Sequence, residues 1–539
     1  MLLEVDNLAV RYRGSPQPAV AGVSFSLGRG ESLGMVGASG SGKTQTALAI
    51  MGLLPAHAEV SGSVRCDGAE LLGLPERELN RFRARRIGMV FQDPASALNP
   101  CLTIGRQLAL VLCTHGVARR GRWRPAAAAL LERVRLPEPQ RLLDVYPHQL
   151  SGGMRQRAMI ALALAAEPDL LIADEPTTAL DVTVQAGILA VLRELEARAG
   201  IGLLLITHDL GVIAENTERM LVLHGGRCVE AGRTADVFRA SAAPHTRALI
   251  AAAPRLDGPQ ARRSPRDGQP PLLALEHVTV SYADGAGRAR MAAEDVSLTV
   301  ARGETLGIVG ESGSGKTTLA RAITGLRAPD AGRVTLAGAV LPAAARDRPP
   351  ALRRRVQMVF QDPAGSLDPA MTVREILDEP LRYAESRRDK ATRAAAAAAL
   401  LARVRLDATL LERRPHELSN GQAQRVALAR ALACDPAVLV CDEAVAALDG
   451  TARAEILSLL AHEQEATGLA LVFITHDLAV VRGIAHRIAV MQAGRICELA
   501  DAESLFRQPR HPYTRALLDA VPVPDPDARR GPLVHDSSA

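Results

Sequence analysis

Aromatic side chains make up only 2% of this 539-residue sequence, so its cores must rely on Leu, Val, Ile and Ala. No apolar run approaches the roughly 18 residues of a membrane-spanning helix. Two acids interrupt the first six residues, which do not have the pattern of a signal peptide. We therefore expect no membrane span in this chain. Any work at a membrane would need other subunits that cross it.

Cysteines are also few, and none of the seven forms a C-x-x-C pair. Their odd number and scattered spacing suit neither a zinc site nor a disulfide framework, and they predict reduced thiols in a cytosolic chain. The net charge is only +5. The many arginines follow helical patterns, as in residues 81–86, whereas a nucleic-acid partner would need a concentrated basic face. We expect no nucleic acid among the partners.

A whole domain is repeated along the sequence. Three of its segments recur 268 positions later, another recurs after 269 positions, and a glycine-rich loop recurs after 273. The length of the chain also exceeds what one hydrophobic core usually serves, so two domains are expected. The recurring pairs are residues 37–44 and 310–317, 91–94 and 360–363, 150–153 and 418–421, 174–175 and 442–443, and 207–209 and 475–477.

Composition predicts where the domains end. Residues 256–271 are rich in Pro, Gly, Arg and Asp and cannot bury a core face, so they are predicted to form a linker. Residues 521–539 are similar and are predicted to form a flexible tail. The two domains are then residues 1–255 and 272–520.

Each half is predicted to be an α/β domain with a mostly parallel sheet. Apolar runs predict buried strands, and helical periodicity predicts the helices between them. The order strand, helix, strand implies parallel pairing. Residues 99–157 are predicted to be mainly helical and to form a separate lobe. In the first half, the predicted strands are residues 32–36, 169–173 and 202–207, and the predicted helices are residues 44–51 and 186–199.

Both glycine loops fit the pattern G-x-x-x-x-G-K-[ST] between a predicted strand and helix. Glycines let the backbone curl until several N–H groups point at phosphate oxygens, and the helix N-terminus adds partial positive charge. Lys43 and Lys316 would hold the β- and γ-phosphates of a nucleotide, while Thr44 and Thr317 would bind Mg²⁺. The candidate nucleotide-binding residues of the loops are Gly37, Ser39, Gly40, Ser41, Gly42, Lys43 and Thr44, and Gly310, Ser312, Gly313, Ser314, Gly315, Lys316, Thr317 and Thr318.

A pair of acids follows an apolar strand in each half, at the edge where open α/β sheets bind ligands. Asp174 and Asp442 are predicted to hold Mg²⁺ through water. Glu175 and Glu443 are predicted to orient or activate the attacking water as catalytic carboxylates. Most such pairs in proteins are surface charge, but here each pair ends a strand and recurs in the repeat.

A histidine and a glutamine recur in both halves as well. His208 and His476 end another strand, and each lies 34 residues past its aspartate, which favours a catalytic contact to the γ-phosphate over a structural role. Gln92 and Gln361 recur in the setting Phe-Gln-Asp-Pro. That recurrence favours a role for both glutamines in sensing the metal and the nucleotide.

The ordered set of glycine loop, glutamine, Leu-Ser-Gly-Gly, Asp-Glu and histidine resembles the ABC ATPase family over nearly the whole chain, twice. The resemblance implies two tandem P-loop NTPase domains of the ABC type, with ATP and Mg²⁺ as cofactors. It also implies that the domains pair head to tail, so that this chain would form a pseudo-dimer alone. The family's adenine-stacking aromatic fits Tyr12 and Tyr282. The segment that caps the γ-phosphate of the opposite domain matches Ser151, Gly152 and Gly153, and Ser419 and Gly421.

The two composite sites would differ. Asn420 replaces a glycine in the second Leu-Ser-Gly-Gly segment, and Met154 replaces the family's glutamine after the first. Asn tolerates left-handed backbone better than most residues, so binding would survive, although its side chain could crowd the phosphate. Asp-Glu-Pro-Thr in the first half also becomes Asp-Glu-Ala-Val in the second. We hypothesise that the first site, capped by Ser419 and Asn420, turns over more slowly.

Residues 506–517 resemble the C-terminal motif of ATPases that serve dipeptide, oligopeptide and nickel importers, and residues 238–249 repeat it in weakened form. The resemblance implies an ATPase that energises peptide import as a peripheral subunit on the cytoplasmic face of the plasma membrane. Its partners would be two integral membrane permease subunits and, indirectly, a solute-binding protein.

Alternatives remain open. A nickel or metal-chelate importer fits because neither half carries the cysteine-rich extension of many peptide-branch members. A tandem ABC ATPase that acts on ribosomes fits less well, because such proteins join their halves by a long charged helix, whereas residues 256–271 are short and Pro-rich. A DNA-repair ATPase would need coiled-coil insertions or zinc cysteines. An exporter ATPase has no support from the His-Pro-Tyr-Thr motif.

Overall fold

The computed structural model describes residues 1–119, 121–178, 180–256, 258, 270–283, 289–384, 389–446, 448 and 450–528. Most of the predicted linker, and residues 529–539 of the predicted tail, lie outside the described residues. The chain divides into two compact units. Unit 1 comprises Met1–Leu180, Val184–Ala253 and Pro522–Ala539, and unit 2 comprises Asp181–Thr183 and Pro254–Val521.

Residues 522–528 of the predicted tail belong to unit 1, whereas Val521 belongs to unit 2. The N–H of Val523 donates a hydrogen bond of 2.8 Å to the carboxylate of Glu215. The carboxylate of Asp527 pairs with the guanidinium of Arg239 at 2.6 Å. These bonds hold the start of the segment against unit 1.

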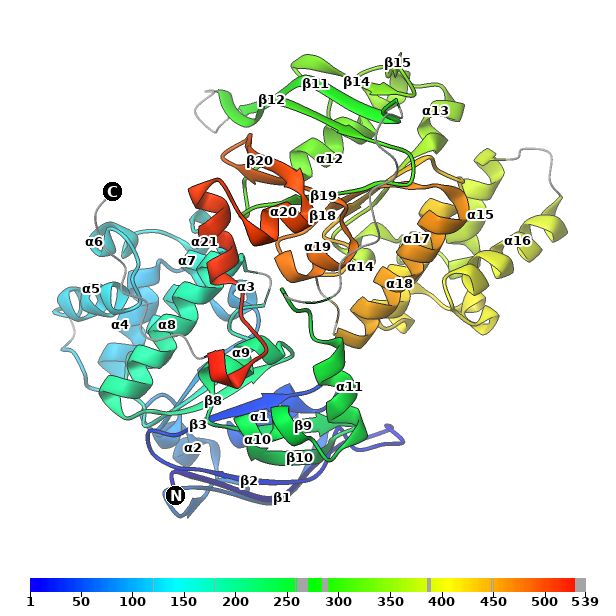
Figure 1. Cartoon of the computed structure of the whole chain (residues 1–539). Coiled ribbons are helices and arrows are strands. Elements are labelled where there is room, and N and C mark those ends of the chain that lie inside the picture. Colours follow the sequence, from blue (N-terminus) through cyan, green and yellow to red (C-terminus); the bar gives the residue numbers. More distant parts are fainter. Residues whose placement is uncertain are drawn as a thin grey trace. The chain divides into compact units, whose positions relative to one another are not determined.

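Both units repeat one series of elements (Figure 1). The strands of unit 1 are β1 (Leu3–Tyr12), β2 (Val20–Leu27), β3 (Ser32–Val36), β4 (Ala58–Cys66), β5 (Ala69–Glu70), β6 (Ile87–Val90), β7 (Leu170–Asp174), β8 (Gly202–Thr207), β9 (Arg219–His224) and β10 (Arg227–Arg233). Its helices are α1 (Lys43–Ile50), α2 (Glu76–Phe82), α3 (Pro94–Ala97), α4 (Ile104–Thr114), α5 (Arg124–Arg133), α6 (Pro139–Leu142), α7 (Gly152–Leu164), α8 (Val182–Ala199), α9 (Leu210–Asn216), α10 (Thr234–Ala240) and α11 (Pro244–Ala252).

Unit 2 follows the same plan, with a 3₁₀ turn (Ala408–Glu412) in the place of α6. Its strands are β11 (Leu273–Ala283), β12 (Ala289–Val300), β13 (Thr305–Val309), β14 (Ala331–Leu336), β15 (Ala339–Val340), β16 (Val356–Val359), β17 (Val438–Asp442), β18 (Ala470–Ile474), β19 (Arg487–Gln492) and β20 (Arg495–Asp501). Its helices are α12 (Lys316–Thr324), α13 (Pro350–Arg355), α14 (Pro363–Ser366), α15 (Val373–Ala384), α16 (Lys390–Arg403), α17 (Asn420–Leu432), α18 (Gly450–Thr467), α19 (Leu478–Ile484), α20 (Ala502–Arg507) and α21 (Pro512–Ala520).

The central sheet of unit 1 has six strands in the order β10-β9-β3-β8-β7-β6, and only β10 runs antiparallel to its neighbour. Every residue of β3, β7 and β8 is buried, which explains why these strands are apolar apart from Ser32, Asp174 and Thr207 at their ends. Unit 2 has the same order, β20-β19-β13-β18-β17-β16. The predicted mostly parallel sheet is therefore confirmed. Its strands bring their carboxyl ends to one edge, where the candidate site residues gather.

Predicted element boundaries hold closely in the core and less well in the helices. The strands predicted at 32–36 and 202–207 coincide with β3 and β8, and β7 lies one residue beyond the strand predicted at 169–173. The helix predicted from residue 186 begins four residues earlier, at Val182. Its first turn includes the β-branched Val182, Thr183 and Val184, whose low helix propensity is overridden in the folded chain.

An additional antiparallel sheet in each unit was not predicted. In unit 1 it has the order β2-β1-β4-β5. Buried and exposed residues alternate along β1 only in two short stretches, because Asn7, with a φ of 47°, lies in an irregularity between Val5 and Leu8. A bulge of this kind breaks the period-two pattern by which a strand is recognised in sequence.

The segment predicted to be a helical lobe forms α4, α5, α6 and the start of α7, as expected. Apolar side chains of α4 at a spacing of four, Ile104, Leu108 and Leu112, are buried in a core that the lobe shares with the strands β7 and β8. The Thr103 hydroxyl caps α4 by accepting a hydrogen bond from the N–H of Arg106. None of the helices in the described part of the chain has both the length and the hydrophobicity that crossing a bilayer requires.

The core of unit 2 depends on Phe473, an aromatic residue on β18 that is fully buried. We expect Phe473→Ala to destabilise the protein by about 3–5 kcal/mol, because the substitution removes buried apolar surface and leaves a cavity. The measurement is urea unfolding followed by circular dichroism. Tyr383→Ala is the control, because Tyr383 is 74% exposed and its replacement should leave the unfolding midpoint unchanged. Equal midpoints for the two variants would contradict this assignment of the core.

Candidate functional site

In each unit a glycine loop joins a central strand to a helix, β3 to α1 and β13 to α12. The Nζ atom of Lys43 donates to the carbonyl oxygens of Gly37 and Ala38, over 2.7 and 3.0 Å. Lys316 makes the matching bonds in the second loop, over 2.7 and 2.8 Å. Both lysines are buried, and burial lowers the pKa of Lys316. The remaining loop residues, Ser39, Gly40, Ser41, Gly42 and Thr44, and Gly310, Ser312, Gly313, Ser314, Gly315, Thr317 and Thr318, form the turn and the first helical residues.

The last glycine of each loop is required by geometry. Gly42 has a φ of 100°, and a Cβ there would lie 2.5 Å from the carbonyl oxygen of Ala19. Gly315 has a φ of 105°, and its Cβ would collide with the carbonyl oxygen of Ala292. A side chain at either position would push the loop away from that carbonyl oxygen, so both glycines fix the curvature that an anion cradle needs.

Oxygen groups suited to Mg²⁺ meet at the start of the helix in both units. Asp174 ends β7 and accepts a hydrogen bond from Thr44. Asp442 ends β17, and its Oδ1 atom lies 3.2 Å from the Thr317 hydroxyl. Among the described residues, the Oδ1 atom of Asp174 and the hydroxyl of Ser41 are buried and have no hydrogen-bond partner. Hydroxyl and carboxylate oxygens that lack a protein partner fit a hard cation such as Mg²⁺.

Glu175 lies at the centre of a second group of side chains. Its backbone has a φ of 46°, and its N–H donates to the carbonyl of Ile206 over 2.8 Å. The carboxylate accepts hydrogen bonds from Gln92 over 3.0 Å and from the Thr178 hydroxyl over 2.8 Å, and His208 Nδ1 lies 3.3 Å from it. The predicted glutamine, glutamate and histidine are thus brought together. A non-glycine residue in the left-handed region is uncommon and costly, which is typical of functional sites.

Unit 2 repeats this group with one change. Glu443 has a φ of 49°, Gln361 donates to it over 2.7 Å, and His476 Nδ1 lies 3.4 Å from its carboxylate. Ala446 occupies the position of Thr178, so Glu443 lacks the hydroxyl bond that Glu175 has. The role of Thr178 was not predicted, although the change to alanine in the repeat marks the position as a difference between the halves.

The pKa values of the neighbouring carboxyl groups of Asp174 and Glu175 are shifted in opposite directions. Burial raises the pKa of Asp174 to about 6, against an opposing hydrogen bond from Thr44. Burial also raises the pKa of Glu175, but the hydrogen bond and charge of His208 and the hydrogen bond of Thr178 outweigh it and lower that pKa to about 2. Unit 2 shows the same directions, with Asp442 raised by burial and Glu443 lowered chiefly by His476. At neutral pH each glutamate is therefore ionised, as a group that accepts a proton from water must be.

The predicted cap residues lie at the first turns of α7 and α17. Ser151 caps α7 by accepting from the N–H of Met154 over 3.3 Å. Ser419 accepts from the N–H of Gln422 over 3.3 Å, and the Gln422 side chain accepts from the N–H of Ser419 over 3.0 Å, which completes a capping box. Asn420 is the first residue of α17 and does not have a positive φ. The tolerance of Asn for a left-handed backbone is therefore not needed at this position, because a helical first turn accepts a side chain.

The two candidate adenine-stacking tyrosines have different surroundings. The hydroxyl of Tyr12 donates a short hydrogen bond to Gln45 on α1, and the ring of His57 lies 5.5 Å away at an angle of 50°. The ring of Tyr282 instead lies 5.4 Å from the guanidinium carbon of Arg327. Tyr282 is 39% exposed, which leaves ring surface for stacking. The contacts of Gln45 and Arg327 were not predicted.

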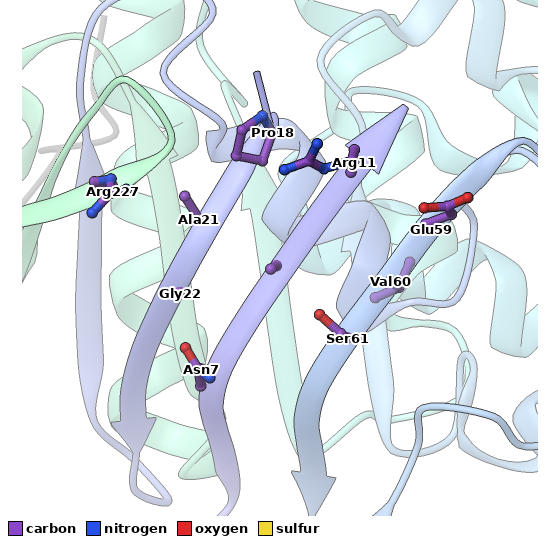
Figure 2. A pocket seen from close by; sticks show the side chains of 10 residues that line it. Asn7, Arg11, Pro18, Ala21, Gly22, Glu59, Val60, Ser61 and Arg227 are labelled. Carbon is purple, nitrogen blue, oxygen red and sulfur yellow. The ribbon is translucent and has the colours of Figure 1, made fainter. Parts of the chain in front are cut away.

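An open hollow of about 480 Å³ lies on the outer face of the antiparallel sheet of unit 1 (Figure 2). Arg11, Glu59 and Arg227 line it, on β1, β4 and β10. Leu8 and Val10 alternate with the lining residues along β1 and are buried in the core that includes residues of β3 and α1. The hollow therefore lies on the opposite face of β1 from the glycine loop, and none of the predicted site residues lines it.

The family model described as ABC transporter matches the chain twice, at residues 20–178 and 293–446. Each match contains a glycine loop, the glutamine, the Leu-Ser segment and the paired acids described above, and together they cover more than half of the chain. The chain belongs to the ABC transporter family. The resemblance seen in the sequence is thereby confirmed, and the chain is an ATPase with two ABC domains.

Further similarities concern the branch of the family. A model of the C-terminal region of oligopeptide/dipeptide transporters matches residues 229–278 and 497–538, once per ABC domain. The Oligopeptide transport ATP-binding protein OppD of Mycobacterium tuberculosis is 42% identical over 98% of this chain and all of its own length. The Glutathione import ATP-binding protein GsiA of Escherichia coli is 42% identical over 98% of this chain and 91% of its own length.

Gly42 has no room for a side chain and Gly40 has room for one, so the two positions allow a matched test of the nucleotide site. We expect Gly42→Ala to abolish nucleotide binding to unit 1, because the added methyl group would collide with the Ala19 carbonyl. Gly40 also has a positive φ, 77°, but a Cβ there meets nothing within 4 Å, so Gly40→Ala should cost about 1 kcal/mol and weaken binding roughly fivefold. Binding of a fluorescent ATP analogue is measured in a Lys316→Ala background. Similar affinities for the two variants would contradict the geometry.

Proposed function

We propose that this chain hydrolyses ATP to drive the import of peptides through a separate membrane permease. The observation that carries this function is that a hydrogen-bonded glutamine–glutamate pair and a match to the C-terminal region of oligopeptide/dipeptide transporters occur together in each half. The relatives named for oligopeptide transport and glutathione import support a peptide substrate, since glutathione is itself a small peptide.

Each ABC domain binds one ATP at its glycine loop. The loop N–H groups and Lys43 or Lys316 bind the phosphates, while the oxygens of Thr44 and Asp174, or of Thr317 and Asp442, with Gln92 or Gln361, hold Mg²⁺. Bound Mg²⁺ supplies positive charge that neutralises the phosphate oxygens. The ionised Glu175 or Glu443 orients the attacking water and accepts its proton. His208 and His476 lie beside these carboxylates and contact the γ-phosphate.

We further infer that the halves pair head to tail as a pseudo-dimer. Adenine stacks on Tyr12 in one site and on Tyr282 in the other. Ser419 and Gly421 then cap the phosphate bound at Lys43, and Ser151, Gly152 and Gly153 cap the phosphate bound at Lys316. Serine hydroxyls and N–H groups at a helix start suit an anion. ATP closes the pair, and hydrolysis reopens it.

The partners in this proposal are two integral permease subunits, with a solute-binding protein that delivers the peptide. The chain would act as a peripheral subunit on the cytoplasmic face of the membrane, where ATP is available. The helical lobes, which contain α4 and α5 in unit 1 and α15 and α16 in unit 2, are the surfaces proposed to dock on the permeases.

The two sites are proposed to hydrolyse ATP at unequal rates, with the first slower. The hydroxyl of Thr178 stabilises the charged form of Glu175, whereas alanine stands at the matching position beside Glu443. A carboxylate that is stabilised in its charged form is a weaker base.

This inequality predicts the outcome of two substitutions. We expect Glu443→Gln to remove more than half of the total ATP turnover, because it leaves only the slower site, and Glu175→Gln to remove less. Phosphate release at saturating ATP is the measurement, with the complete transporter. The double variant is the control and should reduce turnover at least about 100-fold. Equal losses in the two single variants would rule out the inequality.

Transport itself is tested by uptake into cells. The double variant Lys43→Ala/Lys316→Ala should abolish uptake of a labelled dipeptide, because neither loop can hold the phosphates. Cells with the unaltered protein are compared with cells that carry the variant, using labelled dipeptide, labelled glutathione and ⁶³Ni²⁺ in parallel. Loss of ⁶³Ni²⁺ uptake with unchanged peptide uptake would replace the peptide function by the nickel alternative.

A further inference from the structure

The C-terminal motif of unit 2 forms a hydrogen-bonded turn at the start of α21. The carboxylate of Glu498, on β20, accepts hydrogen bonds from the N–H groups of Arg510 and His511 over 2.9 and 3.0 Å. Pro512 occupies the first turn of α21, and the His511 Nδ1 atom accepts from the N–H of Tyr513 over 3.2 Å. A strand residue therefore fixes both the position and the direction of the first turn of this helix.

Tyr513, the aromatic residue of this turn, contacts the glycine loop. Its hydroxyl oxygen accepts a hydrogen bond of 3.1 Å from the N–H of Glu311, the second residue of the loop. Glu311 and its neighbour Gly310 also supply the two carbonyl oxygens that bind Lys316. The tyrosine thus bonds the same short stretch of backbone that holds the phosphate-binding lysine. Burial raises the pKa of Tyr513 to about 12, so the phenol remains neutral at physiological pH.

Unit 1 contains the same frame with a different side chain. The carboxylate of Glu230 accepts from the N–H groups of Ala242 and Ala243, over 2.8 and 3.4 Å, at the start of α11. His245 stands 268 positions before Tyr513, the spacing of the repeat. Its ring lies on that of His224, with 3.8 Å between centroids, and its Nε2 atom is buried without a partner among the described residues.

We propose that Tyr513 is a positioning residue for the nucleotide-binding loop of unit 2, and that the C-terminal region thereby sets ATP affinity in one half of the protein. In unit 1 the matching frame ends in a histidine pair, so the affinity there does not depend on residue 245. The inference rests on the proposed binding of ATP at Lys316. It assigns to the motif a role inside its own ABC domain.

The test compares Tyr513→Phe with His245→Phe, each in two backgrounds. Lys43→Ala leaves only the second site able to bind nucleotide, and Lys316→Ala leaves only the first. With MgATP and the purified full-length chain, Tyr513→Phe in the Lys43→Ala background should raise the dissociation constant about three- to tenfold, the effect of one lost hydrogen bond. In the Lys316→Ala background it should leave the dissociation constant unchanged. His245→Phe should change neither.

Kinetics separate positioning from damage to the fold. In the complete transporter, Tyr513→Phe should raise KM for ATP and retain kcat at saturating ATP, with an unchanged unfolding midpoint. An unchanged affinity at the second site, or an equal loss at both sites, would overturn the inference. So would a loss of affinity with His245→Phe as large as that with Tyr513→Phe. If MgATP bound in neither background, the proposed function itself would be wrong.

Discussion

Each site buries charged side chains at the carboxyl edge of its parallel sheet. The other features of the site provide the hydrogen-bond partners that this burial requires. Lys43, Lys316, Asp174 and Asp442 are all nearly inaccessible, so each needs a partner that remains in place. Loop carbonyls hold the lysines, and threonine hydroxyls hold the aspartates. Because these partners belong to the backbone turn or to the first turn of the following helix, the glycine loop and the charged groups have one structural origin.

Glu175 and Glu443, the glutamates proposed to be catalytic, both have an unfavourable backbone conformation. Both lie directly after a buried strand with a positive φ, and both are secured by an N–H bond to the neighbouring strand. That backbone bond compensates for the unfavourable conformation and leaves the carboxylate facing glutamine and histidine. The same arrangement occurs in both units, although the residues that follow each glutamate differ, so the strained position does not depend on that part of the sequence.

Much of this site can be predicted because its residues stand at strand ends. Buried strands such as β3 and β8 have largely apolar sequences, and a polar residue that follows them must lie at the common edge of the sheet. The acids and the histidines were predicted in this way, with the repeat as support. The lysines were predicted from the glycine-loop pattern, and the glutamines from their recurrence in Phe-Gln-Asp-Pro.

Contacts that depend on side-chain direction could not be predicted. The bond from Thr178 to Glu175 and the bond from Glu311 to Tyr513 depend on the direction in which a turn points its side chains. Sequence periodicity does not indicate that direction. The antiparallel sheet was missed for a related reason, since a bulge at Asn7 divides the pattern of β1 into two short stretches. The backbone of Asn420 could not be predicted from the motif either, because a glycine in a family motif does not by itself imply a left-handed backbone.

Because of the segment Pro522–Ala528, unit 1 is not made of the first half of the sequence alone. It follows α21 in the sequence but packs in unit 1, where Val523 and Asp527 bond Glu215 and Arg239. A gene divided within residues 256–271 would encode a first polypeptide that lacks part of its own unit and a second that ends in a piece foreign to it. In this protein the fusion of the two ABC domains does more than keep them together. Unit 1 is complete only after residues 522–528, which follow unit 2 in the sequence, have been synthesised.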